Sequence, residues 1–332
     1  MKLPDLVCLG IESTAHTFGV SVVQGAKVLS NEKKCFTTTE GGMVPSEVAD
    51  HHVSFFDEIF VSALSKSKKS IKDIDLIAFS SAPGIGHSLR IGAFFARTLA
   101  LKLKKPLIPI NHCIAHLEIG RILSGAKDPV LLYASGANTQ IIAYEASKYR
   151  VFGETLDVGV GNFLDSLGRF LNLGFPAGPK IEQLAKKGKN YIELPYSVKG
   201  MDVSFGGLLT NLKHKIKENK YAVEDLCFSV QETVFAMLTE VVERALAHTD
   251  KSQVLLGGGV ACNSRLQEMI SIMCEERGAK SFVVENEFLV DNAAMIALTG
   301  VLIYSVDKKD YFNDSKINPY QRTDDVVINY RS

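Results

Sequence analysis

The 332-residue sequence lacks several features that would decide its class at once. Its 37 basic and 37 acidic residues leave no net charge, so no global field draws it toward nucleic acid or a membrane surface. No apolar run approaches the roughly 20 residues that a membrane-spanning helix needs. Its six cysteines are scattered without a C-x-x-C pair, which argues against a disulfide framework and against a thiolate zinc site. These absences predict a cytoplasmic protein without a membrane segment.

The length and composition favour a folded protein of two lobes. A hydrophobic fraction of 46% and a charged fraction of 22% are typical of globular proteins. A chain of 332 residues exceeds what one hydrophobic core usually supports. Short runs rich in Val, Ile and Leu alternate with helical patterns and glycine-rich turns, which is typical of α/β architecture.

One pattern occurs twice along the chain. Residues 6–11 and 19–23 predict two strands joined by a polar turn, and residues 130–134 and 140–144 predict a second pair around the turn 135–139. Two such hairpins, each opening a domain-sized segment, predict a duplicated fold with one turn from each half facing a shared cleft. Further strands are expected at 76–80, 106–110 and 253–256, and helices at 89–103, at 223–248, from about 263, and at 292–305, the last packing on the first lobe.

Two histidines stand at the start of a predicted helix. His112 and His116 are four residues apart, which places both imidazoles on one helix face, as two ligands of a single metal ion require. The spacing alone also suits surface or capping residues, and Asn111 before them is expected to be the helix N-cap. A zinc protease of the H-E-x-x-H type would need glutamate where Cys113 stands, so the general base of that enzyme class is missing.

Glycine-rich loops and turn carboxylates are the remaining candidates. The run Gly257-Gly258-Gly259 could admit a phosphate or nucleoside, or could simply form a tight turn. No P-loop sequence occurs, and residues 84–89 depart from the dinucleotide fingerprint. Asp291 stands directly before a predicted helix, where it could be an N-cap or a metal ligand. Further carboxylates lie in or beside predicted turns, namely Asp157, Asp165 and Glu182.

Six segments are distinctive in combination and in order. They are Asn-His-Cys-Ile-Ala-His at 111–116, Tyr-Ala-Ser-Gly-Ala-Asn-Thr at 133–139, Gly-Glu-Thr-Leu-Asp at 153–157, Phe-Pro-Ala-Gly-Pro at 175–179, Gly-Gly-Gly-Val-Ala-Cys-Asn at 257–263 and Asp-Asn-Ala-Ala at 291–294. Together they resemble the universal family of tRNA N6-adenosine threonylcarbamoyltransferases, formerly called O-sialoglycoprotein endopeptidases. The forms at 82–86 and 138–139 are similar to the archaeal and eukaryotic branch, whose members work in the KEOPS complex.

The resemblance implies the α/β fold of actin, sugar kinases and Hsp70, in which two duplicated lobes surround a nucleotide cleft. The expected first lobe comprises residues 1–115 plus about 296–325, and the second comprises 116–295. The family holds one divalent metal ion, with Fe²⁺ favoured and Zn²⁺ as the alternative, and an adenine nucleotide or adenylate. The implied metal ligands are His112, His116, Tyr133 and Asp291. The implied adenylate-binding residues are Tyr133, Ala134, Ser135, Gly136, Ala137, Asn138, Asp165, Gly178, Glu182 and Asn263.

The family's reaction moves a threonylcarbamoyl group from threonylcarbamoyl-adenylate to N6 of adenosine 37, beside the anticodon of tRNA, and releases AMP. An adenine amine is a weak nucleophile, so the metal is expected to polarise the carbonyl group and steady charge on the leaving phosphate. No general base is evident in the sequence. His52 and His87 are candidates for this role without a motif to support them.

The implied partners are tRNA and the other KEOPS subunits, including a small protein kinase and a dimerising subunit. Some archaeal relatives continue into a fused kinase domain. Lysine-rich stretches at 66–72, 102–105 and 213–220 could contact RNA phosphates or could be solvated helix faces.

Two departures and two alternatives accompany the resemblance. Ala137 and Ala177 stand where the family usually has glycine. A position that needs positive φ or very close substrate approach would disfavour the added methyl group, and elsewhere the replacement would be neutral. One alternative is an ATP-dependent small-molecule kinase of the same fold, which would hold magnesium with carboxylates and water. The other is a non-catalytic ATP-dependent assembly factor, for which the histidine pair would be incidental.

Overall fold

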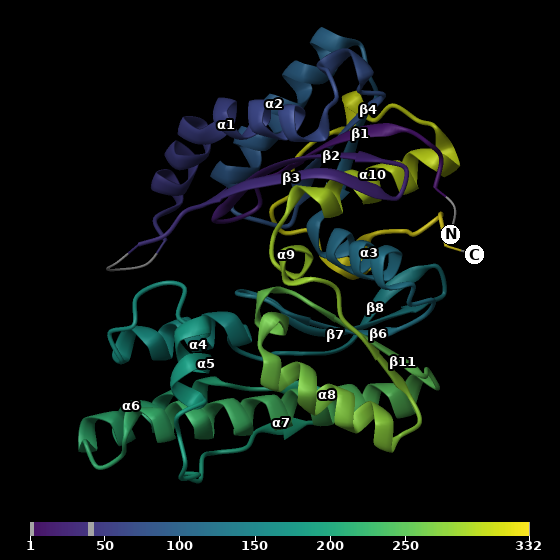
Figure 1. Ribbon diagram of the computed structural model, residues 1–332. Coiled ribbons are helices and arrows are strands. Elements are labelled where there is room, and N and C mark those ends of the chain that lie inside the picture. Colours follow the sequence, from purple (N-terminus) through teal and green to yellow (C-terminus); the bar gives the residue numbers. More distant parts are fainter. Residues whose placement is uncertain (1–2, 39–42, 332) are drawn as a thin grey trace.

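The computed structural model describes residues 3–38 and 43–331, and it contains two five-stranded sheets, one from each half of the chain (Figure 1). The first sheet has the order β3-β2-β1-β4-β5 and the second β12-β11-β6-β7-β8. The strands of the first are β1 (Val7–Glu12), β2 (Thr17–Gln24), β3 (Lys27–Cys35), β4 (Leu76–Ala82) and β5 (Leu107–Asn111). Those of the second are β6 (Val130–Ala134), β7 (Thr139–Glu145), β8 (Lys148–Glu154), β11 (Gln253–Gly257) and β12 (Lys280–Phe282), and a small hairpin joins β9 (Val198–Lys199) to β10 (Asp202–Val203).

The two five-stranded sheets have the same topology. In the first, β1 pairs antiparallel with β2, β2 with β3, while β1 pairs parallel with β4 and β4 with β5. The second repeats this order, with β6, β7 and β8 as the antiparallel run and β11 and β12 as the parallel strands. The duplication predicted from the two hairpins is therefore confirmed.

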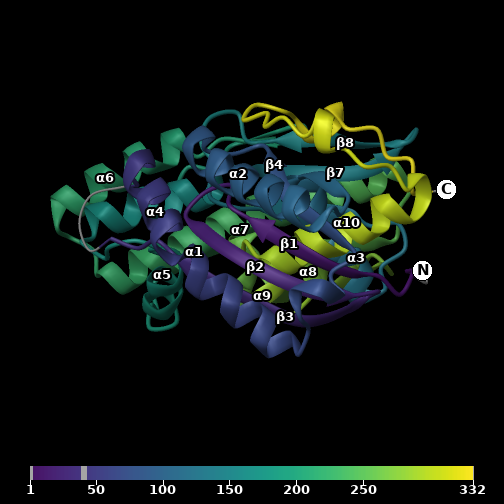
Figure 2. The ribbon, with the colours of Figure 1, turned by 90° about the horizontal axis from the view of Figure 1, so that it is seen from above.

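Helices lie on both faces of each sheet, so the molecule consists of alternating helical and sheet layers (Figures 1 and 2). α1 (Pro45–Ser67) and α2 (Gly86–Leu103) cover the outer face of the first sheet, and α7 (Val223–Thr249) and α8 (Ser264–Glu276) cover that of the second. α3 (His112–Ser124) and α10 (Ala293–Asp307) lie between the sheets. The other helices are α4 (Val160–Phe170), α5 (Gly178–Ala185), α6 (Gly206–Glu218), α9 (Asn286–Leu289) and 3₁₀ turns at Ile71–Asp73, Gly259–Cys262, Phe312–Asp314 and Thr323–Asp325.

The central position of α10 follows from its composition. Ten consecutive residues, Ala293 to Leu302, are buried, because the helix has no polar face to present to water. It packs against β1 as predicted, and Gly10 permits the contact, since a Cβ there would lie 2.7 Å from the backbone nitrogen of Ala297. α10 also packs against α3, which brings the start of each helix toward the same region.

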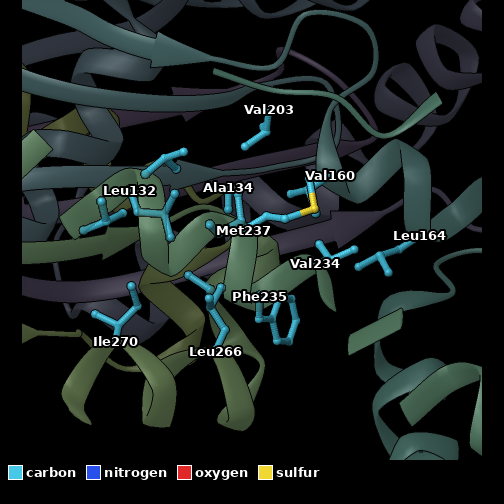
Figure 3. Packing of buried hydrophobic residues seen from close by; sticks show 14 of the residues in the cluster. Leu132, Ala134, Val160, Leu164, Val203, Val234, Phe235, Met237, Leu266 and Ile270 are labelled. Atoms are coloured by element: carbon cyan, nitrogen blue, oxygen red, sulfur yellow. The ribbon is translucent and has the colours of Figure 1, made fainter. Parts of the chain in front are cut away.

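The outer face of the second sheet has its own core. Figure 3 shows side chains from β6, α4, α7 and α8 packed together, among them Leu132, Val160, Phe235, Met237 and Leu266. All five are buried. This packing fixes the end of β6 relative to α4, and therefore the turn that follows β6.

The predicted elements correspond to observed ones, but β3, β8, β12, α1 and α6 are among the observed elements that were not predicted. α2 was predicted, but it begins at Gly86 instead of residue 89. No helix in the described ranges is both long and apolar enough to cross a bilayer. The expected lobe boundary at 115/116 falls inside α3, and the division into lobes stays a prediction.

Candidate active site

His112 and His116 lie on the first turns of α3, directly after β5. The Asn111 side chain accepts hydrogen bonds from the backbone N–H groups of Cys113 and Ile114, at 3.0 and 3.2 Å, so its predicted role as N-cap is confirmed. Both imidazoles are buried, and their ring centroids are 4.7 Å apart. The helical spacing of four residues therefore places the two rings side by side in the interior.

Asp291 comes to the same place from the other half of the chain. Of the two roles considered for it, the N-cap is wrong, because the next residue, Asn292, accepts the N–H of Met295 at 3.0 Å and caps α10. The Oδ1 atom of Asp291 lies 3.3 Å from Nε2 of His112 and 3.3 Å from Nε2 of His116. The carboxylate thus faces both imidazoles.

These three side chains fit a shared metal ion. One potential ligand atom from each lies within 4.8 Å of the other two. Ligands about 2.1 Å from a tetrahedral metal are about 3.4 Å apart, which agrees with the 3.3 Å that separates Asp291 from each histidine. Two imidazoles and one carboxylate suit a divalent cation such as iron or zinc.

At this site, burial and the neighbouring charges have opposite effects on the pKa values of His112 and Asp291. Burial lowers the pKa of the His112 imidazole, but Glu12 and Asp291 outweigh burial and raise this pKa well above its usual value. Burial raises the pKa of Asp291, and the neighbouring His112 and His116 outweigh it and lower this pKa well below its usual range. Without a cation, a proton on His112 offsets the carboxylate charge. Metal binding would displace that proton, because a coordinating imidazole nitrogen must be unprotonated.

Tyr133, the fourth implied ligand, lies beside this group. It is the penultimate residue of β6, its ring centroid lies 5.1 Å from that of His116, and its side chain is buried. Burial, with Cys113 and Asp291 nearby, raises the pKa of the phenol well above its usual value. The tyrosine thus borders the site as a protonated phenol, and its role as a ligand stays a prediction.

The turn after Tyr133 is exposed and made of small residues. Ser135 donates its N–H to the carbonyl of Asn138 at 2.8 Å, and Gly136 is exposed. The N–H groups of Gly161 and Asn162, at the start of α4, donate to the carbonyls of Ser135 and Gly136 at 3.0 and 2.9 Å. The implied adenylate-binding segment is therefore held against the first turn of α4.

Asp165 and Gly178 meet at the corner between α4 and α5. Asp165 Oδ1 accepts the N–H of Ala177 at 2.8 Å, directly before Gly178, the first residue of α5. Ala177 has a φ of −90°, and Ala137 is not among the residues with positive φ. The strain considered for these two alanines therefore does not arise.

Glu182 and Asn263 are joined through Ser264. Glu182 Oε1 accepts the backbone N–H and the hydroxyl of Ser264, at 3.2 and 2.7 Å. Burial raises the pKa of Glu182, but hydrogen bonds from Ser264 and Lys186 outweigh it and lower the pKa. Asn263 accepts the N–H of Arg265 at 2.9 Å as the N-cap of α8. The structure thus groups these two residues, and their contact with adenylate stays a prediction.

The candidates for a general base lie elsewhere. His52 on α1 is fully buried, and its Nε2 lies 3.0 Å from the carbonyl oxygen of Ala15, an arrangement that leaves this atom no substrate proton to accept. His87 is exposed at the start of α2. Neither belongs to the group around Asp291.

The sequence did not single out Glu12 and Thr14, which surround His112. Glu12 is the last residue of β1 and is fully buried, and its Oε2 lies 3.0 Å from Nδ1 of His112. Thr14 Oγ1 lies 3.1 Å from the same nitrogen. The available signal was a single carboxylate that ends an otherwise apolar strand, directly before the turn of the first hairpin.

Comparison with known proteins assigns the family. The sequence profile described as tRNA N6-adenosine threonylcarbamoyltransferase matches residues 26–298. The chain belongs to this family. A relative of that name from Thermococcus kodakarensis is 51% identical over 323 residues, covering 97% of this chain and 99% of that protein. One from Xenopus laevis is 46% identical over 332 residues, with 98% and 99% covered.

A third relative in the family is longer than this chain. The probable bifunctional tRNA threonylcarbamoyladenosine biosynthesis protein of Methanocaldococcus jannaschii is 49% identical over 326 residues. The match covers 98% of this chain but 60% of that protein. The predicted resemblance to the archaeal and eukaryotic branch agrees with these relatives.

Two solved structures share the fold of this chain. T. kodakarensis HypF has a TM-score of 0.62 at 15% identity, covering 94% of this chain and 50% of that chain. The activator of the 2-hydroxyisocaproyl-CoA dehydratase from Clostridium difficile with bound ADPNP has a TM-score of 0.54 at 12% identity, covering 91% and 97%. Such low identities show the fold alone. Together with the repeated sheet topology, they confirm the predicted actin-like, two-lobe α/β fold.

Family membership also settles the enzyme class. The chain is a transferase of the tRNA-modifying family, as predicted. The small-molecule kinase and the assembly factor are not supported, since relatives that match the full length bear the transferase name.

Proposed function

We propose that this chain transfers a threonylcarbamoyl group to N6 of an adenosine in tRNA. One observation carries the proposal: a protein with this activity in its name is 51% identical across 97% of this chain and 99% of its own length. The group formed by His112, His116 and Asp291 adds chemical support, because it fits a divalent cation between the start of α3 and the start of α10.

The proposed donor is threonylcarbamoyl-adenylate, and the proposed acceptor is adenosine 37, beside the anticodon. The N6 amine attacks the carbamoyl carbonyl carbon, the bond from that carbon to the phosphate oxygen breaks, and AMP leaves with the bonding electrons. The amine loses one proton in the same reaction. Because the amine is a weak nucleophile, alignment of both substrates and stabilisation of charge on the carbonyl oxygen must lower the barrier.

The proposed metal ion is iron or zinc. His112, His116 and Asp291 would hold it, with Tyr133 as the fourth ligand, because these side chains adjoin one another in the interior. A bound divalent cation supplies Lewis-acid stabilisation of charge on the carbonyl oxygen and on the departing phosphate. The chain's own part is to hold the imidazoles and the carboxylate in fixed positions, which burial and the Asn111 cap support.

The adenylate is proposed to bind along the turn from Tyr133 to Asn138. This assignment is supported by the exposure of Gly136 and Ala137, which leaves the turn open to a ligand. The carboxylates of Asp165 and Glu182 would accept hydrogen bonds from ribose hydroxyl groups. The remaining residues of the proposed site are Ala134, Ser135, Gly178 and Asn263.

The proposed partners, besides tRNA, are the other KEOPS subunits, including a small protein kinase and a dimerising subunit, in the cytoplasm. The longer bifunctional relative supports a second activity in close association, because the match covers 60% of its length and the rest lies outside the match. Residues 1–115 with about 296–325, and residues 116–295, are the proposed lobes, a division consistent with the two sheets.

The activity is tested with metal-loaded protein, unmodified tRNA and threonylcarbamoyl-adenylate, with and without the partner subunits. The modified nucleoside is measured by mass spectrometry after digestion of the tRNA. We expect incorporation that is lost in the variant carrying both His112→Ala and His116→Ala. Transfer at the wild-type rate by that variant would contradict the metal role, and no transfer under any partner condition would contradict the proposed activity.

A further inference from the structure

Glu12 is a buried carboxylate for which the proposed reaction has assigned no role. It ends β1, and its side chain has no exposed surface. Its Oε1 accepts the backbone N–H of Thr14 at 2.7 Å and the Thr14 hydroxyl at 2.5 Å. A buried carboxylate is costly unless it is paired and hydrogen-bonded. The Thr14 bonds occupy one oxygen, which leaves Oε2 for His112.

The His112 ring lies between two carboxylates. Its Nδ1 is 3.0 Å from Oε2 of Glu12, and its Nε2 is 3.3 Å from Oδ1 of Asp291. One nitrogen therefore faces the first sheet, and the other faces the candidate metal site. His116 differs, because its buried Nδ1 has no hydrogen-bond partner among the described residues.

We propose that Glu12 is a positioning residue for the metal site. It accepts the Nδ1–H of His112, so that the lone pair of Nε2 is directed toward Asp291 and His116, and Thr14 in turn holds Glu12. Metal-binding histidines commonly donate their second ring nitrogen to a carboxylate, which fixes the tautomer and the ring orientation. The inference rests on the proposed metal site.

Charge balance supports the same arrangement. With both histidines neutral, Glu12 and Asp291 place two negative charges around the site, and a divalent cation would neutralise them. Glu12 thereby contributes charge without being a ligand, since its two oxygens are already bonded to Thr14 and His112. A cation held in this way is stabilised most by carboxylates that are themselves fixed.

The test is a titration of the metal-free full-length protein with Co²⁺, followed by the visible absorption of the bound ion. We expect Glu12→Gln to weaken binding about 10- to 100-fold and to change the spectrum, because loss of such an outer carboxylate has effects of this size. Glu118→Gln is the matched control. Glu118 is an equally buried carboxylate on α3, bonded to Arg121 and Tyr149 instead of a candidate ligand, so its variant should keep the wild-type Co²⁺ affinity.

Two further variants separate positioning from charge and from folding. Glu12→Asp keeps the charge but withdraws the carboxylate from Nδ1, and Thr14→Val removes the hydroxyl bond to Oε1. Both should also weaken Co²⁺ binding, the second by less. Circular dichroism establishes that each variant is folded, and if Glu12→Gln is not, these two carry the test.

The outcomes test the role of Glu12 separately from the proposed metal site on which that role depends. If the wild-type protein does not bind Co²⁺, the metal site itself is wrong. If the wild type binds and the folded Glu12 and Thr14 variants match it in affinity and spectrum, the role of Glu12 is overturned. A lower melting temperature with unchanged affinity would likewise show that Glu12 acts on stability alone.

Discussion

The turn between β1 and β2 and the turn between β6 and β7 occupy the same place in the two copies of the sheet. In the first turn, Ser13 and Thr14 are buried, and Glu12 before them is bonded to His112. In the second turn, Gly136 and Ala137 are exposed. One copy of the turn is thus buried beside the candidate metal ligands, and the other is exposed.

The backbone around the two turns has been kept alike. Gly84 follows β4 and lies so close to the first turn that a Cβ there would be 2.6 Å from the carbonyl oxygen of Thr14. Gly258 follows β11, the counterpart of β4, and its Cβ would overlap the carbonyl of Ala134. The glycine-rich loops noted in the sequence therefore have a structural reason in both halves. The two turns therefore differ in the burial of their side chains, while a glycine packs closely against each of them.

The largest expected effect is a loss of Co²⁺ affinity at the candidate metal site. Asp291→Asn keeps the side-chain shape but removes the charge of a candidate ligand, so Co²⁺ affinity should fall more than about 100-fold, or about 2.7 kcal/mol. Ser135→Ala, in the open turn, should leave Co²⁺ affinity unchanged and weaken the binding of AMP. Calorimetric titration of each variant with Co²⁺ and with AMP measures both. Equal losses of Co²⁺ affinity in the two variants would show that the open turn supports the metal site as strongly as Asp291 does.

The next effect concerns the glycines behind the turns. Gly258 has a φ of +89° and also lacks room for a Cβ, so Gly258→Ala should destabilise the protein by about 2 to 3 kcal/mol. Gly84→Ala should cost less, about 1 to 2 kcal/mol, because Gly84 is not among the residues with positive φ. Urea unfolding measures the free energy.

Gly207→Ala is the control for both glycine variants. Gly207 is exposed on α6, and a Cβ there would have nothing within 4 Å. The substitution should stabilise the protein by roughly 0.5 to 1 kcal/mol. A destabilisation of the same size as in Gly258→Ala would mean that close packing is not the cause.

Lowering the pH should reduce the free energy of unfolding through a histidine bonded to the first turn, and the second turn has no such histidine among the described contacts. His52 is bonded to Ala15 in the first turn, and burial, together with His51 and His16, lowers its pKa to about 4. The unfolded chain takes up a proton near pH 6.5, so the stability from neutral His52 is present above that pH and is lost as the pH falls toward 4. The loss is at most about 1.4 kcal/mol per pH unit for one group.

His52→Gln isolates this contribution, because the glutamine amide can still donate to Ala15 but does not titrate. Urea unfolding at pH 7 and pH 5 should show a smaller pH dependence in the variant than in the wild type. An identical pH dependence would place its source in other groups.

The smallest effect tests whether the duplication extends to helix capping. Asn111 caps α3 after β5, and Asn292 caps α10 after β12, the counterpart of β5. Asn111→Ala and Asn292→Ala should each destabilise the protein by about 1 kcal/mol. Thermal unfolding followed by circular dichroism compares the two, and Asn→Asp at each position should restore most of the loss. A cost at one position alone would show that only one cap stabilises its helix.

Much of the fold was predictable because its signals are local. The apolar run 130–134 was predicted at its observed bounds, and the cap at Asn111 follows from one side chain and the two amides beyond it. The two histidines share a helix face for the same reason. By contrast, β3 was missed because it is an edge strand of mostly polar residues, which form no apolar run in the sequence.

The candidate site was only partly predictable. Spacing alone left Asp291 equally suited to be an N-cap or a ligand, and the structure assigns the cap to its neighbour Asn292. Glu12 and His112 are 100 residues apart, and no local pattern connects them. Their contact depends on β1 and β5 lying on either side of β4 in the sheet.

The sequence by itself determined most strands of the two five-stranded sheets, the repeated hairpin, the paired histidines and, through its motifs, the family. These properties depend on side-chain periodicity and on bonds within a few residues. Only the tertiary structure decided which carboxylates meet His112, because Glu12 comes from the end of β1 and Asp291 from the segment between α9 and α10. Sheet order and the buried helices between the sheets bring both of them to His112. A buried charge needs partners on all sides, and these partners are neighbours in space and not in the chain.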